Sequence, residues 1–202
     1  MPRGGDVEER EAIERHYRAV WPDRVVTSTH WAPGPIAERL PDLHVVTIAP
    51  PTEGDPWIYA TAGAWRVNED GAHGIEFVAM HEGESLEVVE QLGVLAFYHA
   101  GPPENRLDVG HTLSIGKPWV QGSTLDALLI SLPYPWGPTL EHCHVGKRHF
   151  RILWVVPIYE IEREFAQTNG VEALERRFDA AGLNVLNRRR ASVVDSHDVR
   201  AP

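Results

Sequence analysis

The chain of 202 residues is long enough for one domain with a buried core, and its 43% hydrophobic and 24% charged residues are ordinary for a globular protein. Its formal net charge of −10 argues against nucleic acid as a direct partner, because an acidic protein and a phosphate backbone repel each other. The same charge would attract a basic protein, or it serves solubility alone. Cys143 is the only cysteine, so no intrachain disulfide can form, and no stretch resembles a signal peptide or a membrane span. We therefore expect a soluble, cytoplasmic protein that binds neither nucleic acid nor membrane.

Residues 1–40 are predicted to form a helix and a connection that belong to the same domain as the following segment. Asp6 can cap this helix, because a carboxylate there accepts hydrogen bonds from the N–H groups of the first turn. Ile13, Tyr17 and Val20 recur at helical spacing and share one apolar face, and Pro22 ends the helix.

Apolar segments with a strand pattern follow the first helix. They are LHVVTIA from Leu43, WIYATAGAWRV from Trp57 and GIEFVAM from Gly74, with a turn at residues 68–71 between the last two. Phe77 lies in the middle of the third segment and is expected in the core. Trp57, Tyr59 and Trp65 fall on one face of the second segment, where three rings indicate either core or an interaction platform, and both interpretations stay open.

A second helix is predicted to begin at Ser85, whose hydroxyl is a suitable N-cap. Val88, Leu92 and Ala96 belong to its buried stripe. Gly93 within this helix is unfavourable by about 1 kcal/mol relative to Ala, and a close contact between the helix and the sheet at this position would explain it.

The second half of the chain contains three further predicted strands and two helices. The strands are RLDVGHTLSI, LDALLISL and FRILWVV, and the helices are IYEIEREFAQ and VEALERRFDAAG, separated at Asn169-Gly170 and ended by Gly182. The apolar periodicity is lost from Arg188 onward, so the end of the chain is predicted to be frayed, with residues 195–202 as a flexible tail. Strict βαβ alternation is missing, which predicts an α+β fold over residues 41–194 with a mixed, largely antiparallel sheet and helices packed on one side of it.

Motifs of known catalytic chemistry are missing. The sequence has no glycine-rich dinucleotide fingerprint, no phosphate-binding GK[ST] loop, no G-x-S-x-G elbow and no two-histidine zinc helix motif. We therefore predict no catalytic residue, no cofactor and no metal. Adjacent residues such as Ser196-His197-Asp198 do not make a triad, because a triad is defined by geometry in space. The run Arg188-Arg189-Arg190 follows a helix end, where it either complements the helix dipole, is solvated, or contacts a partner or anion.

The Pro- and Gly-rich connection from Tyr134 to His149 is the candidate partner-binding region. Trp136 lies in a Pro-Gly loop, where it is either an exposed interface anchor or a lid folded over the core. His142 and His144 would point to one side of a strand, which supplies fewer ligands than zinc needs unless the fold adds more. The partner-binding candidates are Trp136, Tyr134, His142, His144, Trp57, Tyr59 and Trp65.

Several blocks, taken in order, resemble the suppressor of fused family. They are DPWIYATAGAWRV, HGIEFVAM with Glu76 at the family's glutamate, QLGVLAFY, LDVGHTLSIGKPW, DALLISLPY and FRILWVVPIYEIEREFAQTNGVEALERRF, which is the strongest. The resemblance extends from about Leu43 to Val194. It implies a SUFU-like α/β sandwich without a catalytic centre, which works by binding another protein.

Animal members of this family bind a zinc-finger transcription factor and carry a second domain that this chain is too short to contain. His111 also stands where animal members have an acid that helps to hold the partner peptide, so their activity is not transferred. The resemblance to short bacterial members implies an immunity-type protein that binds and neutralises a toxin, and a basic toxin would suit the acidic charge. The alternatives are a regulatory or scaffold protein unrelated to toxins, and a hydrolase or metal-dependent enzyme that uses the His142–His149 region. The sequence leaves the oligomeric state open.

Overall fold

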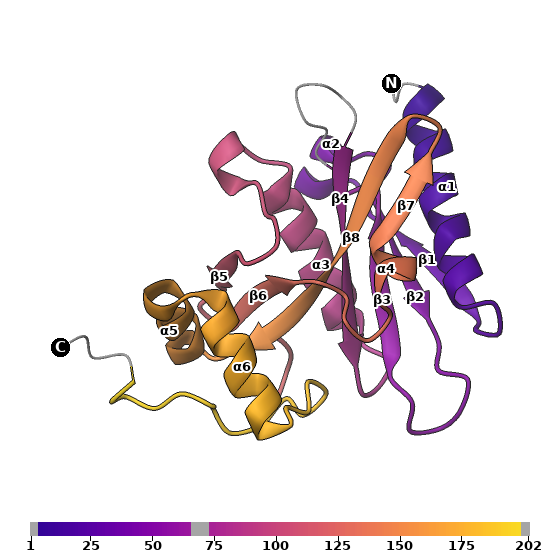
Figure 1. The fold of residues 1–202 in the computed structure, drawn as a ribbon. Coiled ribbons are helices and arrows are strands. Elements are labelled where there is room, and N and C mark those ends of the chain that lie inside the picture. Colours follow the sequence, from indigo (N-terminus) through magenta and orange to yellow (C-terminus); the bar gives the residue numbers. More distant parts are fainter. Residues whose placement is uncertain (1–3, 66–72, 199–202) are drawn as a thin grey trace. The chain divides into compact units, whose positions relative to one another are not determined.

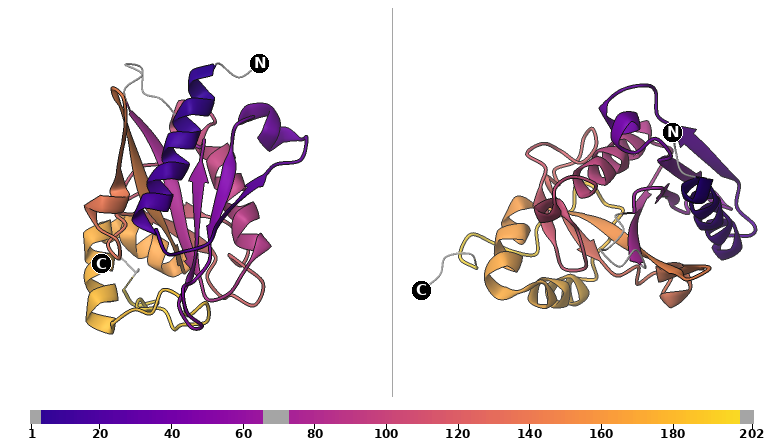
Figure 2. Two further views of the ribbon diagram at one scale, coloured as in Figure 1. Left: turned by 90° about the vertical axis from the view of Figure 1, so that its right-hand side faces the viewer. Right: turned by 90° about the horizontal axis from the view of Figure 1, so that it is seen from above.

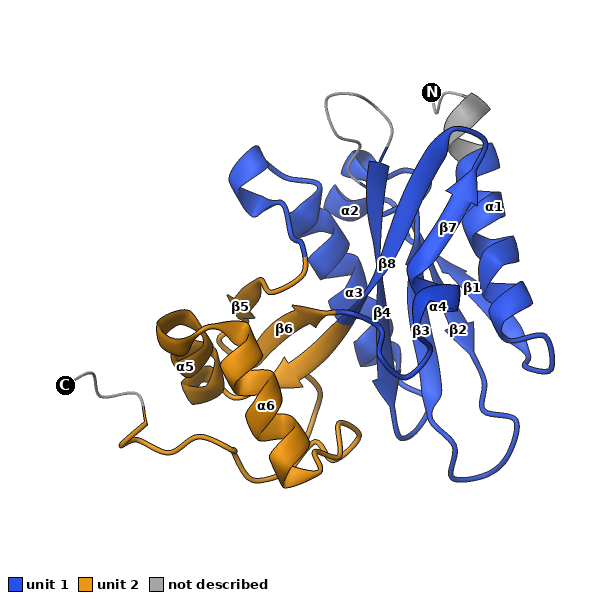
Figure 3. Cartoon of the chain, in the orientation of Figure 1, with its two compact units in different colours: residues 1–108, 132–154 blue, residues 109–131, 155–202 orange. Residues whose placement is uncertain are grey.

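A computed structural model of the chain describes residues 4–65 and 73–198 (Figure 1). The chain divides into two compact units, of which the first comprises residues 1–108 and 132–154 and the second comprises residues 109–131 and 155–202 (Figure 3). The turn predicted at residues 68–71 lies outside the described residues. Within the described ranges, no helix is long and apolar enough to cross a membrane. The domain boundaries expected at residues 41 and 194 stay predictions.

The first unit contains four of the helices and most of the strands. Its helices are α1 Gly4–Val20, α2 Pro35–Arg39, α3 Leu86–His99 and α4 Pro138–Glu141, with a 3₁₀ helix at Pro103–Asn105. Its strands are β1 Val26–His30, β2 His44–Ile48, β3 Trp57–Ala62, β4 His73–His81, β7 His142–Val145 and the first part of β8, which spans Arg148–Ile158. The long predicted elements are present, but the strand predicted from Trp57 ends at Ala62, so Trp65 lies beyond it and does not share a strand face with Trp57 and Tyr59. Elements β1, α2 and α4 are too short to give a periodic signal. The first helix begins before Asp6, the residue expected to cap it.

The strands of the first unit pair in the order β1-β2-β3-β4-β8, and β7 also pairs with β8. All of these pairs are antiparallel except β4 with β8, which is parallel and places His73 opposite His149. The described chain has a mixed sheet of eight strands, so the predicted α+β class with a mixed, largely antiparallel sheet is confirmed.

Helices α1 and α3 cover opposite faces of the sheet in the first unit (Figure 2). Successive residues of β4 point to these two faces: Glu76 lies close to Tyr17 of α1, and the Phe77 ring meets His99 of α3 with 5.3 Å between ring centroids. The expectation that helices lie on one side only is therefore wrong. The physical reason is that every residue of β2 and all but the first of β3 are buried, so both faces of these strands need a cover.

Gly93 is needed because an indole ring occupies the space beside it. A Cβ at this position would lie 2.1 Å from the Trp31 ring. The expected contact between the helix and the sheet is therefore wrong in its partner: the close contact at Gly93 is with Trp31, the residue that follows β1.

The buried carboxylate of Glu76 closes the turn that follows β3. It accepts hydrogen bonds from the Thr61 hydroxyl at 2.5 Å and from the backbone N–H groups of Gly63 and Ala64 at 2.9 and 3.1 Å. Gly63 has φ +108°, and a Cβ there would lie 2.7 Å from the Asp42 carbonyl oxygen, so only glycine fits. Burial raises the pKa of Glu76 to about 7, while the hydrogen bonds from these donors act in the opposite direction.

The second unit is a smaller layer of helices on strands. It contains β5 Thr112–Ser114, β6 Ala127–Ser131, the end of β8, α5 Glu160–Asn169 and α6 Val171–Ala181. Strands β5 and β6 are antiparallel, and α5 packs on both of them and on α6. The predicted ends are confirmed: Gly170 separates the helices with φ +87°, and Gly182 ends α6 in the left-handed conformation.

The segment from Arg188 to Val194 is partly buried, so the expectation of a frayed end is wrong for these residues, while the flexible tail expected at residues 195–202 stays a prediction. Arg190 and Val194 are buried. The Arg177 guanidinium donates two hydrogen bonds of 2.7 Å to the carboxylate of Asp198, and this contact lowers the pKa of that carboxyl to about 2. The sequence pattern did not predict this arrangement, because the segment is held by individual polar pairs and has no periodic row of apolar residues.

Candidate functional site

The loop between residues 133 and 137 displays one aromatic side chain and turns another inward. The Trp136 and Gly137 N–H groups both donate to the Pro133 carbonyl at 2.9 Å, which closes the loop into a tight turn. Tyr134 projects from this turn with 62% of its surface exposed. An exposed tyrosine offers an apolar ring together with a hydroxyl and is well suited to a protein interface.

Trp136 is half-buried because it lies between two other tryptophans. Its ring meets the edge of Trp21 at 5.8 Å and of Trp154 at 6.1 Å between centroids, with interplanar angles of 87° and 77°. Of the two alternatives for Trp136, the structure favours the one in which the ring folds back over the core. A role of Trp136 as an interface anchor stays a prediction, and only the exposed part of its ring could contact a partner.

Four histidines from three strands come together in the first unit. His142 and His144 lie on β7 and are exposed, while Cys143 between them is buried, as the strand alternation predicts. The His144 ring stacks on His149 with centroids 4.6 Å apart, and His142 Nδ1 lies 3.0 Å from His149 Nε2. His73 meets His149 edge-on at 5.8 Å.

The sequence did not indicate that His73 belongs to this group. It lies far from the other histidines along the chain and reaches them through the parallel pairing of β4 with β8. A parallel pairing leaves no local mark in the sequence, because the two strands are joined by a long connection. No short motif could therefore have identified this residue.

His149 lies at the centre of the group, and the pKa of its imidazole is shifted. Burial lowers the pKa of His149, and the neighbouring His144, His142 and His73 lower it further, because each added charge repels the next. The exposed His142 and His144 rings offer aromatic faces and ring nitrogens to a partner.

The surface around these histidines is fixed to α1 and to its own strands. Arg148 makes a 2.5 Å ion pair with Glu9, and His16 Nε2 lies 3.0 Å from the Leu140 carbonyl oxygen. Arg151 pairs with Glu141 at 2.7 Å. These contacts hold the histidine-bearing hairpin in one position, which reduces the entropy lost on binding a partner.

The other proposed partner contacts are less accessible. Trp57 and Trp65 are half-buried, and the Trp65 ring meets the edge of Phe150 at 5.6 Å. Tyr59 is buried, and its hydroxyl accepts a hydrogen bond from Ser85 N at 2.7 Å and donates one to the Gly83 carbonyl. Tyr59 is thus a core residue and not a partner contact. It stands in a strand with a neighbour on either side and a helix over it, so its ring has no path to the surface.

In this region, Cys143 and the histidines of β7 have side chains of types that can act as nucleophiles or metal ligands. Burial raises the pKa of the Cys143 thiol to about 11, with Glu76 adding to the effect, so this cysteine is not a thiolate nucleophile at neutral pH. In the described ranges, no three residues of the His, Cys, Asp and Glu types are placed to hold a metal ion together. The expectation that the protein uses no metal stays a prediction.

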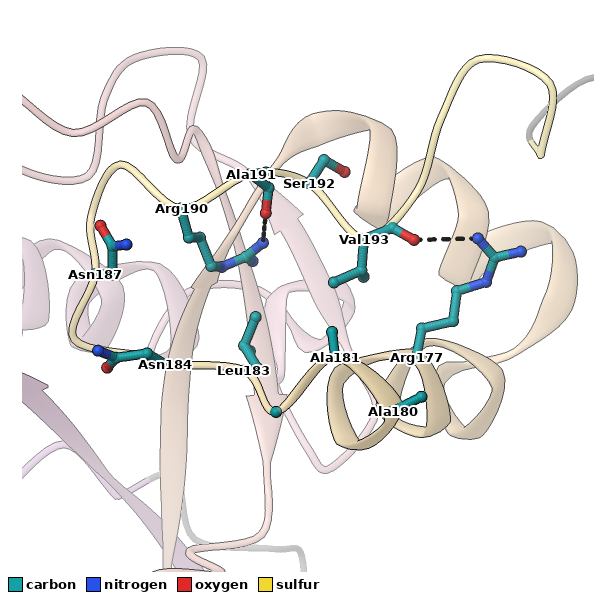
Figure 4. Close-up of a pocket in the computed structure, with 11 residues that line it drawn as sticks. Arg177, Ala180, Ala181, Leu183, Asn184, Asn187, Arg190, Ala191, Ser192 and Val193 are labelled. Atoms are coloured by element: carbon teal, nitrogen blue, oxygen red, sulfur yellow. Dashed lines mark hydrogen bonds between the residues drawn. The ribbon is translucent and has the colours of Figure 1, made fainter.

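A separate hollow of about 590 Å³ lies in the second unit (Figure 4). The end of α6 and the following chain from Gly182 to Val193 line it. Arg190 is almost fully buried there and is bound to Glu162 and to the Ala191 carbonyl, although its Nε has no hydrogen-bond partner. The guanidinium charge is already paired with the Glu162 carboxylate.

Comparison with known proteins identifies the fold. The family model described as suppressor of fused protein (SUFU) matches residues 39–191. No curated protein matches the sequence. Among solved structures, a SUFU homologue from Neisseria gonorrhoeae is 34% identical over 94% of this chain and 98% of its own, with a TM-score of 0.82.

Two more distant structures share the fold. A chain of the Sufu–Fu complex is 15% identical, with a TM-score of 0.68 and 92% of each chain covered. Drosophila Suppressor of Fused is 16% identical, with a TM-score of 0.69 over 92% of this chain. This chain spans about half of the Drosophila protein, since the match covers 51% of it.

Proposed function

Because the chain belongs to the suppressor of fused family, we propose that it works by binding another protein and not by catalysis. The observation that carries this proposal is the family membership over most of the chain, together with a relative of the same fold in the Sufu–Fu complex. The contact region that we propose comprises Tyr134 and the exposed histidines of β7, which lie in the same connection between β6 and β8.

The finer proposal is that the partner is a basic toxin, which this protein neutralises in the manner of an immunity protein. The charge distribution supports a basic partner. The first unit contains 11 of the 19 Lys and Arg residues and 20 of the 29 Asp and Glu residues. The second unit contains the other 8 basic and 9 acidic residues. The acidic excess is thus concentrated in the unit that carries the proposed contact region. Opposite charge accelerates encounter and helps to exclude wrong partners.

The test begins with affinity capture of the partner from the native source, using the whole chain as bait. The captured protein is then expressed alone and together with this chain in a host cell. An immunity protein restores growth that its partner arrests. A partner that does not affect growth contradicts the immunity role and indicates a regulatory or scaffold protein. Failure to capture any protein contradicts the binding function itself.

A control bait separates specific capture from charge alone. Tyr134→Ala leaves the acidic charge unchanged but removes the exposed ring from the proposed contact region. Capture by the wild type and not by this variant supports the region. Equal capture by both places the contact elsewhere on the molecule.

A further inference from the structure

Helix α3 presents a solvent face that combines apolar and acidic side chains. Leu86, Glu90, Val94 and Tyr98 follow one another at four-residue spacing, and all four are exposed. Leu86 is 74% exposed and Val94 is 54% exposed, on the outside of a helix whose opposite face is buried against the sheet. Side chains four residues apart lie along one ridge of a helix. We call this ridge the α3 stripe.

The segment around the α3 stripe is strongly acidic. Glu82, Glu84 and Glu87 are exposed at the start of the helix, beside Glu90 of the stripe itself. The sequence contains no Lys or Arg between Arg66 and Arg106. Glu87 lies in the first turn of α3, where a carboxylate interacts favourably with the helix dipole. Because this effect is limited to the first turn, it explains the position of only one of these carboxylates. It accounts for neither Leu86 nor Val94.

The other end of α3 has a different charge. The Arg39 guanidinium lies over the Phe97 ring, 3.9 Å from its centroid, and also donates to the Phe97 carbonyl. The face is therefore acidic toward Leu86 and neutral to basic toward Tyr98, with apolar side chains along its length. Single exposed apolar residues are ordinary on a protein surface, but a row of them at helical spacing beside like charges is not.

We propose that the α3 stripe binds a basic amphipathic helix of the protein partner, which rests on the proposed function as a protein-binding domain. Three helical turns separate the first and last members of the stripe, a length of about 18 Å at 1.5 Å per residue. Such a ridge packs into the groove of a second helix. The bound helix places apolar side chains on the stripe and Lys or Arg over the acidic end. Its own basic residues avoid the end at which Arg39 lies.

The inference can be tested without the natural partner. The probe is a fluorescent 21-residue synthetic helix with Leu along one face and Lys beside it, titrated against the whole chain and followed by anisotropy. One control peptide has the same composition in scrambled order, and a second has Glu in place of Lys. The protein binds the first peptide at least tenfold more tightly than either control, and the binding weakens with salt.

Two protein variants locate the binding site. Val94→Ser removes an apolar group from the stripe and weakens binding of the Lys peptide about tenfold. Val25→Ser is the matched control, because Val25 is 70% exposed in the same unit but precedes β1, and it leaves binding unchanged. Equal binding by wild type and Val94→Ser, or equal binding of ordered and scrambled peptides, overturns the inference.

The outcomes distinguish this inference from the proposed function. If the natural partner is captured and binds Val94→Ser as tightly as wild type, the α3 stripe is not its contact, while the protein-binding function stands. If the peptide binds at the stripe but no natural partner is found, the surface is confirmed and the proposed function fails.

Discussion

Glu162 and Arg190 form a bidentate ion pair, with 2.6 Å between each oxygen and its nitrogen, and both side chains are almost entirely shielded from solvent. The pair joins α5 to a segment 28 residues further along the chain. The same carboxylate accepts hydrogen bonds from Tyr159 N at 3.0 Å and Val193 N at 2.9 Å. One side chain thus determines the start of α5 and the path of the C-terminal segment.

Glu162→Gln should destabilise the protein by about 3–5 kcal/mol, because it leaves the Arg190 charge buried without its counterion. Glu172→Gln is the control, since Glu172 and Arg176 are exposed and 4.0 Å apart, and it should change the free energy of unfolding by less than about 0.5 kcal/mol. Urea denaturation of both variants measures the difference. Similar midpoints for the two would mean that the buried pair contributes no more than an exposed one.

Truncation after Val194 should be tolerated, whereas truncation after Leu186 should not. The first removes Asp198 and its pairing with Arg177, which is accessible to solvent, and keeps Arg190 and Val194. The second removes both of these buried residues and leaves Glu162 without its partner. Soluble yield and thermal melting compare the two. Loss of soluble protein on the shorter deletion would show that residues 195–202 are required for folding.

Phe77→Ala should destabilise the first unit by about 3–5 kcal/mol, because it empties a fully buried site between the sheet and α3. Leu86→Ala is the control on the exposed side of α3, and it should leave the melting temperature nearly unchanged. A Phe77→Ala melting temperature within a degree or two of wild type would mean that the ring does not contribute to the core.

Glu76 should make the protein less stable as the pH rises. Its pKa in the folded protein is raised to about 7 from an ordinary value of 4.5, so the unfolded chain releases this proton more easily than the folded one. The stabilisation is complete below about pH 4.5 and is lost as the pH rises through about 7. Glu76→Gln, which does not titrate, should show a flatter dependence of the unfolding free energy on pH in this window.

The comparison of wild type with Glu76→Gln isolates this effect from that of His149. The pKa of His149 is lowered, so its contribution to stability is present above its ordinary pKa of 6.5 and is lost as the pH falls, in the opposite direction. His149 is common to both proteins and cancels in the difference. Parallel curves for the two proteins would show that Glu76 is ionised across the whole range.

Once the partner is known, substitutions of Tyr134 and Trp136 should differ in their effects: one should weaken binding and the other should lower stability. Tyr134→Ala should weaken binding by about 2 kcal/mol without changing the melting temperature, because the ring is exposed. Trp136→Ala should lower the melting temperature, because its ring packs between Trp21 and Trp154. Calorimetric titration and thermal melting of both variants test this. Unchanged binding by Tyr134→Ala would exclude this loop as the contact.

Association with the partner should also depend on salt. If the acidic charge of the chain steers a basic partner, the association rate should fall about tenfold or more between low and high salt, while the dissociation rate changes little. Stopped-flow mixing at several ionic strengths measures both rates. A constant association rate would remove the argument for a basic partner.

The sequence by itself determined the elements with a long, regular pattern. Helix α3 with its Ser85 cap, the strands around Phe77, and the break at Gly170 all depend on residues close together in the chain, so the local pattern was sufficient. The order of these blocks was likewise enough to indicate the family, which the family model and the structures confirm.

Tertiary structure alone decided which residues meet across long stretches of sequence. The parallel pairing that brings His73 to His149, the ring of Trp31 over Gly93, and the ion pair of Glu162 with Arg190 each join distant segments. None of these contacts produces a periodic pattern in the sequence, because each depends on one pair of side chains and on the path of the chain between them. The candidate surface was therefore predictable as a region, but its exposed and buried members became distinguishable only when the chain was folded.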